Sequence, residues 1–336
     1  MSGKRARRFW RIYKENLSAC EGENTTVPSM GTSTTNSTDK DRLLLALQDV
    51  EGDIEWSVPL STVTSLQVGG PADVLVAPKD IANVARIILG ARRQHLPVVV
   101  LGGTNVVVRD KGIRGIVMQL KHLTAMKKEG SDRMYAEAGV RMPVLMQFAV
   151  RHQWSGMEWA AGIPGTVGGG VAMNAGTRLG EMKDALQAVD FVNSRGRRMR
   201  IEASALTFSY RKTILPKGIV VGAWFQLKAA AQQQIEQVTK SYLQYRKETQ
   251  PLTLPNAGSV FKNPPGHSAG RLVESLGLKG LRIGHAEVST KHANFIVNQG
   301  GATASDVLAL IRKVRGLVAQ QLGFHLELEL KILGER

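Results

Sequence analysis

The chain has 336 residues, of which 43% are hydrophobic, so it is long enough for two or three domains with ample core. No apolar run reaches the roughly 18 residues that a membrane helix needs, and the single Cys20 excludes an intramolecular disulfide and a cysteine-based metal cluster. The formal net charge of +16 favours an anionic partner. Because no RNA-binding signature is present, we prefer a phosphate-bearing substrate to a nucleic acid, and we predict no metal site.

Residues 1–42 form a segment of separate character. Six basic residues against Glu15 alone give residues 1–20 a net charge of +5, and residues 23–39 are rich in Thr, Ser and Asn. Such a composition has little apolar surface to bury, which predicts a disordered tail that the folded part does not need. An amphipathic membrane anchor around Phe9 and Trp10 is the alternative.

From Leu43 to residue 228 the pattern is that of a globular region with many short strands. Residues 66–76 predict two strands around a Gly-Gly-Pro turn, and Asp80 is placed to cap the helix that follows. The apolar run 97–101 predicts a buried strand that leads into the turn Gly102-Gly-Thr-Asn105. Short strands with few helices indicate an α+β fold. Further strands are expected at 106–108, 113–120, 134–138, 188–193, 198–202 and 219–227, with a helix from Pro143.

The stretch Gly162–Gly176 holds six glycines in fifteen residues. Glycine lets a backbone turn sharply and approach a ligand closely, and successive free N–H groups can form a concave site for an anion. Two tight turns without a ligand are the alternative for this stretch taken alone. The second small-residue turn, at residues 102–105, favours the anion site.

Residues 229–336 are expected to form the last domain. A loop rich in Pro, Gly and Asn lies at 251–265, and Thr303 and Asp306 form a capping box for a long helix that Gly323 ends. The other expected elements are helices at 229–247 and 269–276, strands at 286–289 and 295–298, and a final strand in which Leu326, Leu328, Leu330 and Ile332 alternate with Glu327, Glu329 and Lys331.

A set of motifs in a fixed order runs from about residue 60 to residue 334. They are Val68-Gly-Gly-Pro-Ala-Asp73, Gly102-Gly-Thr-Asn105, Gly162-Ile-Pro-Gly-Thr-Val-Gly-Gly169, Met173-Asn-Ala-Gly176, Tyr210-Arg211, Gly258-Ser-Val-Phe-Lys-Asn263, Lys291-His-Ala-Asn-Phe295 and the final strand. Together they resemble the UDP-N-acetylenolpyruvoylglucosamine reductases, also called UDP-N-acetylmuramate dehydrogenases.

The resemblance implies an FAD-binding fold of the PCMH/vanillyl-alcohol-oxidase type at residues 43–228. Its two α+β subdomains would divide near residues 110–125, and a C-terminal α+β substrate domain would occupy residues 229–336. FAD would be bound and NADPH would donate the hydride. The FAD-binding residues that the resemblance implies are Gly69, Gly70, Gly102, Gly103, Thr104, Asn105, Gly162, Ile163, Pro164, Gly165, Thr166, Gly168 and Gly169.

The activity that the resemblance implies is reduction of the enolpyruvyl ether of UDP-N-acetylglucosamine to UDP-N-acetylmuramate, a peptidoglycan precursor. Ser259 matches the proton donor, and Arg211 and Glu329 match the groups that bind and polarise the enolpyruvyl carboxylate. A guanidinium can hold two carboxylate oxygens, and fixed charges aimed at developing negative charge stabilise a transition state. Weaker matches for substrate binding are Lys247, Lys262, Asn263 and His292.

Each catalytic candidate has a purely structural alternative. Ser259 follows a Gly in a Pro-rich loop, which is usual for a turn residue, and Arg211 could form a surface ion pair. Glu329 lies on an alternating strand whose outer face is solvated by default, and Glu327 on that face competes for its role.

Two other functions stay open at this point. One is an FAD-dependent alcohol oxidase or dehydrogenase on the same scaffold, and the other is a basic nucleic-acid-binding protein. The span between Arg211 and Ser259 has room for about one helix, which resembles the shorter class of the family, without the added loop that places a Tyr over the substrate diphosphate. We expect a monomeric cytoplasmic enzyme with no nucleic-acid partner and no stable membrane insertion.

Overall fold

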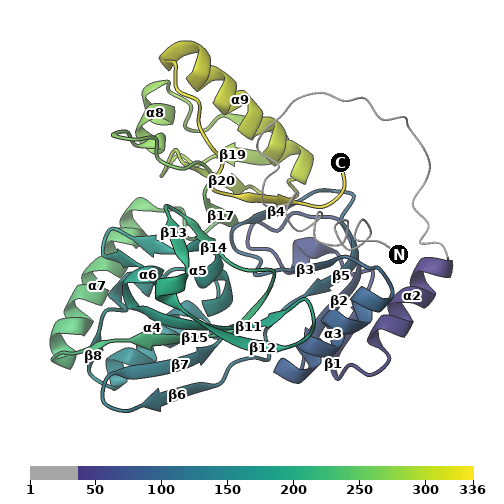
Figure 1. Cartoon of the computed structure of the whole chain (residues 1–336). Helices are drawn as coiled ribbons and strands as arrows, with labels where there is room; N and C mark the ends of the chain where they lie inside the picture. The colour runs from purple at the N-terminus through teal and green to yellow at the C-terminus, as the bar shows by residue number, and fades with distance from the viewer. Residues whose placement is uncertain (1–36) are drawn as a thin grey trace.

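The computed structural model describes residues 37–336, and the expectations for residues 1–36 lie outside the described residues (Figure 1). The first described element is α2 (Ser37–Leu47), so a helix replaces the expected disorder over residues 37–42. Leu43, Ala46 and Leu47 are buried in the same cluster as residues of α3 (Ile81–Arg93), and Gly90 of α3 lets the backbone of Ala46 approach closely. Because a short helix is stable only when its apolar face is packed, this contact stabilises α2.

The first subdomain is a four-stranded sheet in the order β1-β2-β5-β3, in which only β1 runs antiparallel to its neighbour. Val74 and Val76 of β2 face the cluster that contains α2 and α3, whereas Leu75 faces the opposite side. Asp80 caps α3 as predicted, because its side chain accepts a hydrogen bond from the Asn83 N–H. The elements are β1 (Gly52–Trp56), η1 (Leu60–Thr62), β2 (Ala72–Pro78), α3, β3 (Val98–Val100), β4 (Val106–Val108) and β5 (Ile113–Met118).

The expected strand before the Gly-Gly-Pro turn is wrong. Residues 66–71 lie outside any strand, and only residues 72–78 form β2. Gln67 has φ 56° and Gly69 has φ 135°, and neither value belongs to extended backbone.

The second subdomain is a five-stranded antiparallel sheet in the order β12-β11-β15-β7-β6, and α4 and α5 pack into the cluster on one face of it. Pro143 occupies the first turn of α4, as expected. The elements of this subdomain are β6 (Met126–Glu129), β7 (Arg133–Glu137), α4 (Met142–Arg151), β8 (Trp154–Ser155), η2 (Glu158–Ala160), α5 (Val167–Met173), β9 (Gly176–Thr177), β10 (Gly180–Glu181), α6 (Met182–Ala185), β11 (Leu186–Asn193), β12 (Arg198–Glu202), η3 (Ala203–Ala205), β13 (Thr207–Ser209), β14 (Lys212–Ile214), β15 (Gly218–Gln226) and β16 (Lys228–Ala229).

Helix α7 (Gln232–Thr249) packs with the second subdomain, although the predicted boundary at residue 229 assigned it to the last domain. Tyr242 of α7 is buried in the same cluster as residues of α4 and β15. Figure 1 shows α7 beside α4 and β8, on the far side of this subdomain from α9 (Ala304–Leu322). The packing therefore places the start of the C-terminal domain after residue 249.

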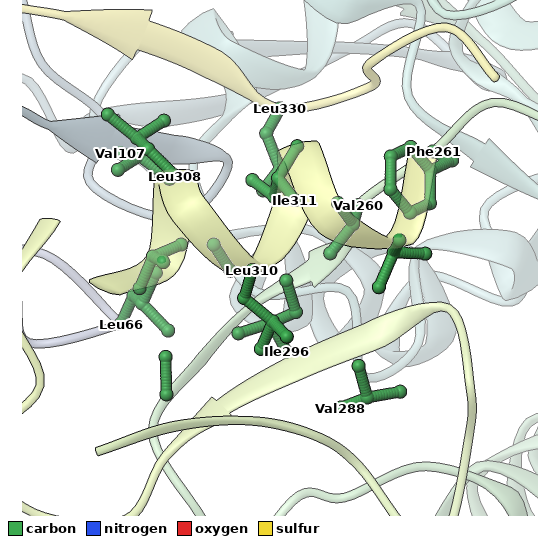
Figure 2. Close-up of a cluster of buried hydrophobic side chains, with 14 of the residues drawn as sticks. Leu66, Val107, Val260, Phe261, Val288, Ile296, Leu308, Leu310, Ile311 and Leu330 are labelled. Atoms are coloured by element: carbon green, nitrogen blue, oxygen red, sulfur yellow. The ribbon is translucent and has the colours of Figure 1, made fainter. Parts of the chain in front are cut away.

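The C-terminal domain is a four-stranded antiparallel sheet in the order β17-β20-β19-β18, packed with the long helix α9. Thr303 and Asp306 form the predicted capping box of α9, and Gly323 ends it with φ 72°. The core of this domain also contains Leu66 and Val107 from the first subdomain, so the two units share one apolar cluster (Figure 2). The elements are β17 (Asn256–Ser259), α8 (Ala269–Ser275), β18 (Arg282–Ile283), β19 (Ala286–Val288), β20 (Phe295–Asn298) and α9 (Ala304–Leu322).

The end of the chain joins the C-terminal domain to the first subdomain. The expected single strand over residues 326–332 is wrong, because only a bridge between Leu328 and Phe261 and the short β21 (Lys331–Leu333) are formed. Strand β21 pairs in parallel with β4, not with the C-terminal sheet. Residues 327–331 therefore cross from one unit to the other, directly beside the Gly102–Asn105 turn.

Candidate active site

The Gly102–Asn105 turn presents unpaired backbone donors. Within residues 37–336, the N–H groups of these four residues donate no hydrogen bond to the protein. A Cβ on Gly102 would meet nothing within 4 Å, whereas one on Gly103 would lie 2.4 Å from the Val63 carbonyl oxygen. The turn is thus packed on one side and open on the other, as the predicted anion site requires.

The second Gly-rich stretch adds further donors next to the first. In the described part of the chain, the N–H groups of Gly162, Gly165, Thr166 and Gly169 also donate no hydrogen bond to the protein. The Oγ1 of Thr104 lies 2.9 Å from the position of a Cβ on Gly165, so the two turns are in contact. Residues 167–173 form the short helix α5 instead of a second turn, and Thr166 precedes it as N-cap.

Gly69 and Gly70 have a structural explanation. A Cβ on Gly69 would lie 2.8 Å from the Cβ of Val108, and one on Gly70 would lie 1.9 Å from the carbonyl oxygen of Asp110. The Gly70 N–H already donates to the Arg109 carbonyl. The protein backbone therefore fills the space that a ligand would need beside Gly70.

Arg211 lies at the tip of the β13–β14 hairpin. Ser209 pairs with Lys212, so Tyr210 and Arg211 form a two-residue turn, and Arg211 has φ 58°. Its Nε lies 3.2 Å from Oε1 of Glu329, and its guanidinium lies 4.9 Å from the centre of the Tyr210 ring. Within residues 37–336, the two terminal nitrogens of Arg211 donate no hydrogen bond to the protein. Two adjacent guanidinium nitrogens can bind both oxygens of a carboxylate.

Glu329 is fixed by its own backbone between two parts of the site. Its N–H donates to the Val260 carbonyl at 2.9 Å, and its carbonyl accepts from Nδ2 of Asn105 at 3.2 Å. Its side chain is 14% exposed. Burial raises the pKa of the Glu329 carboxyl above its usual value, and Arg211 and Lys262 oppose this shift. The Glu329 carboxyl is therefore easier to protonate than an exposed glutamate, and in its protonated form it can donate a hydrogen bond.

Ser259 ends β17, where the strand has an irregular register. Asn256 pairs with Val297 and Ser259 pairs with Phe295, so the pairing is interrupted between them, at Gly258 with φ 80°. Such irregularities re-aim the next side chain, and they are common beside active sites. Within the described residues, the Ser259 hydroxyl forms no hydrogen bond with the protein. Because the neighbouring Val260 pairs with Glu329, this segment lies against the one that meets Arg211.

The structure separates Glu329 from its competitor Glu327. The Glu327 side chain is 75% exposed and pairs with Lys262, whose Nζ lies 3.0 Å from its carboxylate. Glu329, and not Glu327, is the carboxyl that meets Arg211. The positive charge of Lys262 also acts on Glu329, where it lowers the pKa of the carboxyl and so opposes the effect of burial.

The remaining substrate candidates have mixed surroundings. Lys247 is exposed at the end of α7, and its carbonyl accepts a hydrogen bond from Nζ of Lys291. The Asn263 side chain accepts from the Ala269 N–H at 3.0 Å, which is a structural role at the start of α8. Burial and Lys279 lower the pKa of His292, so its ring is neutral near pH 7 and accepts from the Asn294 N–H.

One residue of this region was not predicted as a site residue. Asn174 is fully buried, closes α5 and binds the hairpin that carries Arg211. Apart from the family motif Met173-Asn-Ala-Gly176, its signal in the sequence is an Asn directly after a helix, a position that favours residues that tolerate a left-handed conformation.

The arrangement fits a dinucleotide-type cofactor with a diphosphate. Eight unpaired N–H groups on two touching turns suit an anion, and the open faces of Gly102 and Gly169 allow close approach.

Among residues 37–336 no cluster of His, Cys, Asp and Glu could hold a metal ion. The same residues include no helix long and apolar enough to cross a membrane. The fold and the site define an α+β protein with a binding site for a dinucleotide cofactor.

Comparison with known proteins identifies the family. Residues 72–202 match the model of an FAD binding domain, and residues 250–333 match that of the UDP-N-acetylenolpyruvoylglucosamine reductase C-terminal domain. The chain is 46% identical over 279 residues to the UDP-N-acetylenolpyruvoylglucosamine reductase of Moorella thermoacetica, which covers 82% of this chain and 92% of that protein. The enzyme of Caldanaerobacter subterraneus is 41% identical over 289 residues, which are 85% of this chain and 95% of that protein.

A solved structure gives the same result. The crystal structure of UDP-N-acetylenolpyruvylglucosamine reductase from Thermus caldophilus matches with a TM-score of 0.73 and 40% identity, over 84% of this chain and 99% of that one. The chain belongs to the UDP-N-acetylenolpyruvoylglucosamine reductase family. The predicted family and the predicted fold of an FAD-binding part with a C-terminal domain are confirmed.

Proposed function

We propose that this chain reduces the enolpyruvyl ether of UDP-N-acetylglucosamine to UDP-N-acetylmuramate, with NADPH as hydride donor, in the synthesis of peptidoglycan precursors. One observation supports the proposal most strongly. Arg211 from the second subdomain meets Glu329 from the C-terminal segment, and Asn105 of the first Gly-rich turn binds the backbone of Glu329. Three parts of the chain thus place cation, carboxyl and N–H donors together.

The proposed FAD site comprises the two touching turns. The N–H groups of residues 102–105 and of Gly162, Gly165, Thr166 and Gly169 are the donors available for its phosphates and ring oxygens. Bound FAD would carry the hydride from NADPH to the terminal carbon of the enolpyruvyl group. Gly69, Gly70, Gly103 and Gly168 support this site by letting backbone segments pack closely, because a Cβ at each would lie 3.0 Å or less from a neighbouring atom.

Arg211 is proposed to hold the substrate carboxylate. Its Nε is occupied by Glu329, which leaves the two terminal nitrogens to form parallel hydrogen bonds with the carboxylate oxygens. Addition of hydride beside a carboxylate places negative charge on those oxygens, and a fixed guanidinium stabilises that charge. Protonated Glu329 would donate to the same oxygens, and its raised pKa favours that form.

Ser259 is proposed to give its hydroxyl proton to the carbon next to the carboxylate. Its hydroxyl is free of protein hydrogen bonds within the described residues, so it is available to the substrate. We propose that Lys262, which follows Ser259 in the same segment, supplies the positive charge that stabilises the serine after it has lost its proton. We further propose that Lys247 and Lys262 contribute charge for the substrate diphosphate, and that the enzyme acts as a monomer in the cytoplasm.

The test is substrate-dependent consumption of NADPH by the purified protein with FAD bound. The proposal predicts that NADPH bleaches the flavin absorption without air, and that the enolpyruvyl ether restores it with formation of UDP-N-acetylmuramate. Reduction of the flavin by an alcohol, with no response to the enolpyruvyl ether, would instead support the alcohol oxidase. A colourless protein that takes up no FAD and binds DNA or RNA with steep salt dependence would support nucleic-acid binding.

A further inference from the structure

The amide of Asn174 links three segments of the second subdomain. Asn174 ends α5 with φ 42° and has no exposed surface. Its Oδ1 accepts from the Lys183 N–H at 3.0 Å, and its Nδ2 donates to the Glu181 carboxylate at 3.0 Å and to the Ser209 carbonyl at 3.3 Å. Both amide hydrogens and the amide oxygen therefore have partners, as a buried amide requires.

The Ser209 contact is the one that reaches the candidate active site. Ser209 and Lys212 close the two-residue turn that carries Arg211, and Arg211 itself is held in the left-handed region. The same hairpin is attached to α5 a second time, because Oγ1 of Thr213 donates to the Val171 carbonyl at 2.5 Å. The last turn of α5 thus holds the hairpin on both sides of Arg211.

Helix α5 also begins at the Gly-rich turn. Thr166, Val167 and Gly168 lie at its start, and Asn174 lies at its end seven residues after Val167. A seven-residue helix is too short to bend appreciably, so its end has a fixed position relative to the unpaired N–H groups at its start. The hairpin attached to that end inherits this position.

We propose that Asn174 is a positioning residue for Arg211. By holding the hairpin, Asn174 sets the distance of the Arg211 guanidinium from Glu329 and from the proposed FAD site. This inference rests on the proposed function, because it assigns Arg211 to the substrate carboxylate. A misplacement of about 1 Å in a group that orients a substrate can reduce a rate by about 100-fold. Loss of the Ser209 contact should therefore impair the step that uses Arg211 and leave the step that does not use it.

The first variant is Asn174→Gly, which removes the three amide contacts but tolerates φ 42°. We expect FAD to stay bound and flavin reduction by NADPH to stay within a few-fold of the parent. Reoxidation by the enolpyruvyl ether should slow by about 10- to 100-fold. The matched control is Asn193→Ala, which removes a turn amide that accepts from the Arg195 and Arg197 N–H groups on another hairpin, and it should leave both rates unchanged.

The second variant keeps the left-handed preference and tests the donor. Asn174→Asp retains an acceptor for the Lys183 N–H, but it loses the donor to Ser209 and places a carboxylate beside Glu181. Its reoxidation should slow at least as much as that of Asn174→Gly. If Asn174→Gly does not fold, this variant carries the test, and loss of folding in both would overturn the inference in favour of a purely structural role.

A double-mutant cycle with Arg211→Lys distinguishes positioning from general damage. If Asn174 acts through Arg211, then Asn174→Gly should slow reoxidation by less than about threefold once Arg211 is Lys, because the effects of residues that act through one another are non-additive. Provided that the parent enzyme turns over, two results would overturn the inference. One is an equal slowing of reoxidation by Asn174→Gly in the parent and in Arg211→Lys, and the other is near-parent reoxidation of Asn174→Gly. A parent that is never reoxidised by the enolpyruvyl ether would instead refute the proposed function.

Discussion

The substitution Ser259→Ala separates the two half-reactions. Within the described residues the Ser259 hydroxyl forms no hydrogen bond with the protein, so its removal breaks no intramolecular hydrogen bond. The side chain is half-buried, and we expect a change of less than about 0.5 kcal/mol in the free energy of unfolding. Ser259 lies in the C-terminal domain, whereas the proposed FAD turns lie in the other two units, so flavin content should not change.

The kinetic effect should fall on one step only. Positioned proton transfer contributes roughly 100- to 10,000-fold to a rate, which corresponds to about 3 to 5 kcal/mol of transition-state stabilisation. Stopped-flow absorbance of the flavin should therefore show near-parent reduction by NADPH and reoxidation by the enolpyruvyl ether slowed by at least 100-fold. Ser259→Cys should recover part of that loss, because a thiol with a pKa near 8.5 is more acidic than a hydroxyl.

Two results would refute this reasoning. Reoxidation of Ser259→Ala within a few-fold of the parent rate would show that another group donates the proton. Failure of both half-reactions together, with loss of flavin, would show that Ser259 only maintains the loop between β17 and α8.

Three further predictions follow from packing and charge. Gly102→Ala should keep the stability of the apoprotein, because its Cβ faces open space, but it should lose FAD affinity, because that space is the proposed cofactor site. Gly103→Ala should instead lower Tm, because it combines φ 78° with a clash against the Val63 carbonyl. Equal FAD retention by Gly102→Ala and the parent would contradict the proposed cofactor site. Asp110→Ala should cost about 1 to 2 kcal/mol in urea unfolding, since the Asp110 carboxylate accepts from the Ala304 and Ser305 N–H groups at the start of α9, and an unchanged midpoint would contradict that role. Because the folded state raises the pKa of Glu329, the stability that this carboxyl contributes is present below the ordinary pKa of 4.5 and is lost as the pH rises through the raised pKa. Glu329→Gln should remove this decline in the free energy of unfolding. If the variant and the parent show the same pH dependence of unfolding, this assignment is wrong.

Local signals in the sequence predicted the elements well where the cause is local. The Asp80 cap and the Thr303–Asp306 capping box depend on residues three positions apart, and both are confirmed. The Gly102–Asn105 turn was expected to offer free N–H groups, and within the described chain it does. Composition and spacing were sufficient because these features involve one short segment each.

Features that depend on distant partners were not predicted from residue patterns. The end of the chain alternates like a strand, yet Glu329 is held by Val260 and Asn105, and β21 pairs with β4 across the domain boundary. Helix α7 has an apolar face that suits either neighbour, and only its packing with α4 shows which one it joins. The sequence pattern alone also left Glu327 and Glu329 equivalent, and burial beside Arg211 distinguishes them.

Asn174 is a similar case. Its motif, Met173-Asn-Ala-Gly176, was noted for its resemblance to the family, but no local pattern connects residue 174 with residue 209. The contact exists because β13 and β14 fold back onto the end of α5. A residue that acts by holding another leaves only a weak signal in a single sequence.

The central claim is that one site takes a hydride from NADPH and delivers it to the enolpyruvyl ether. The most direct test is a single-turnover experiment without air, in which NADPH-reduced holoenzyme is mixed with one equivalent of UDP-N-acetylglucosamine enolpyruvate. The account predicts full return of the flavin absorption together with an equal amount of UDP-N-acetylmuramate. Flavin that stays reduced, or that returns without this product, would contradict it.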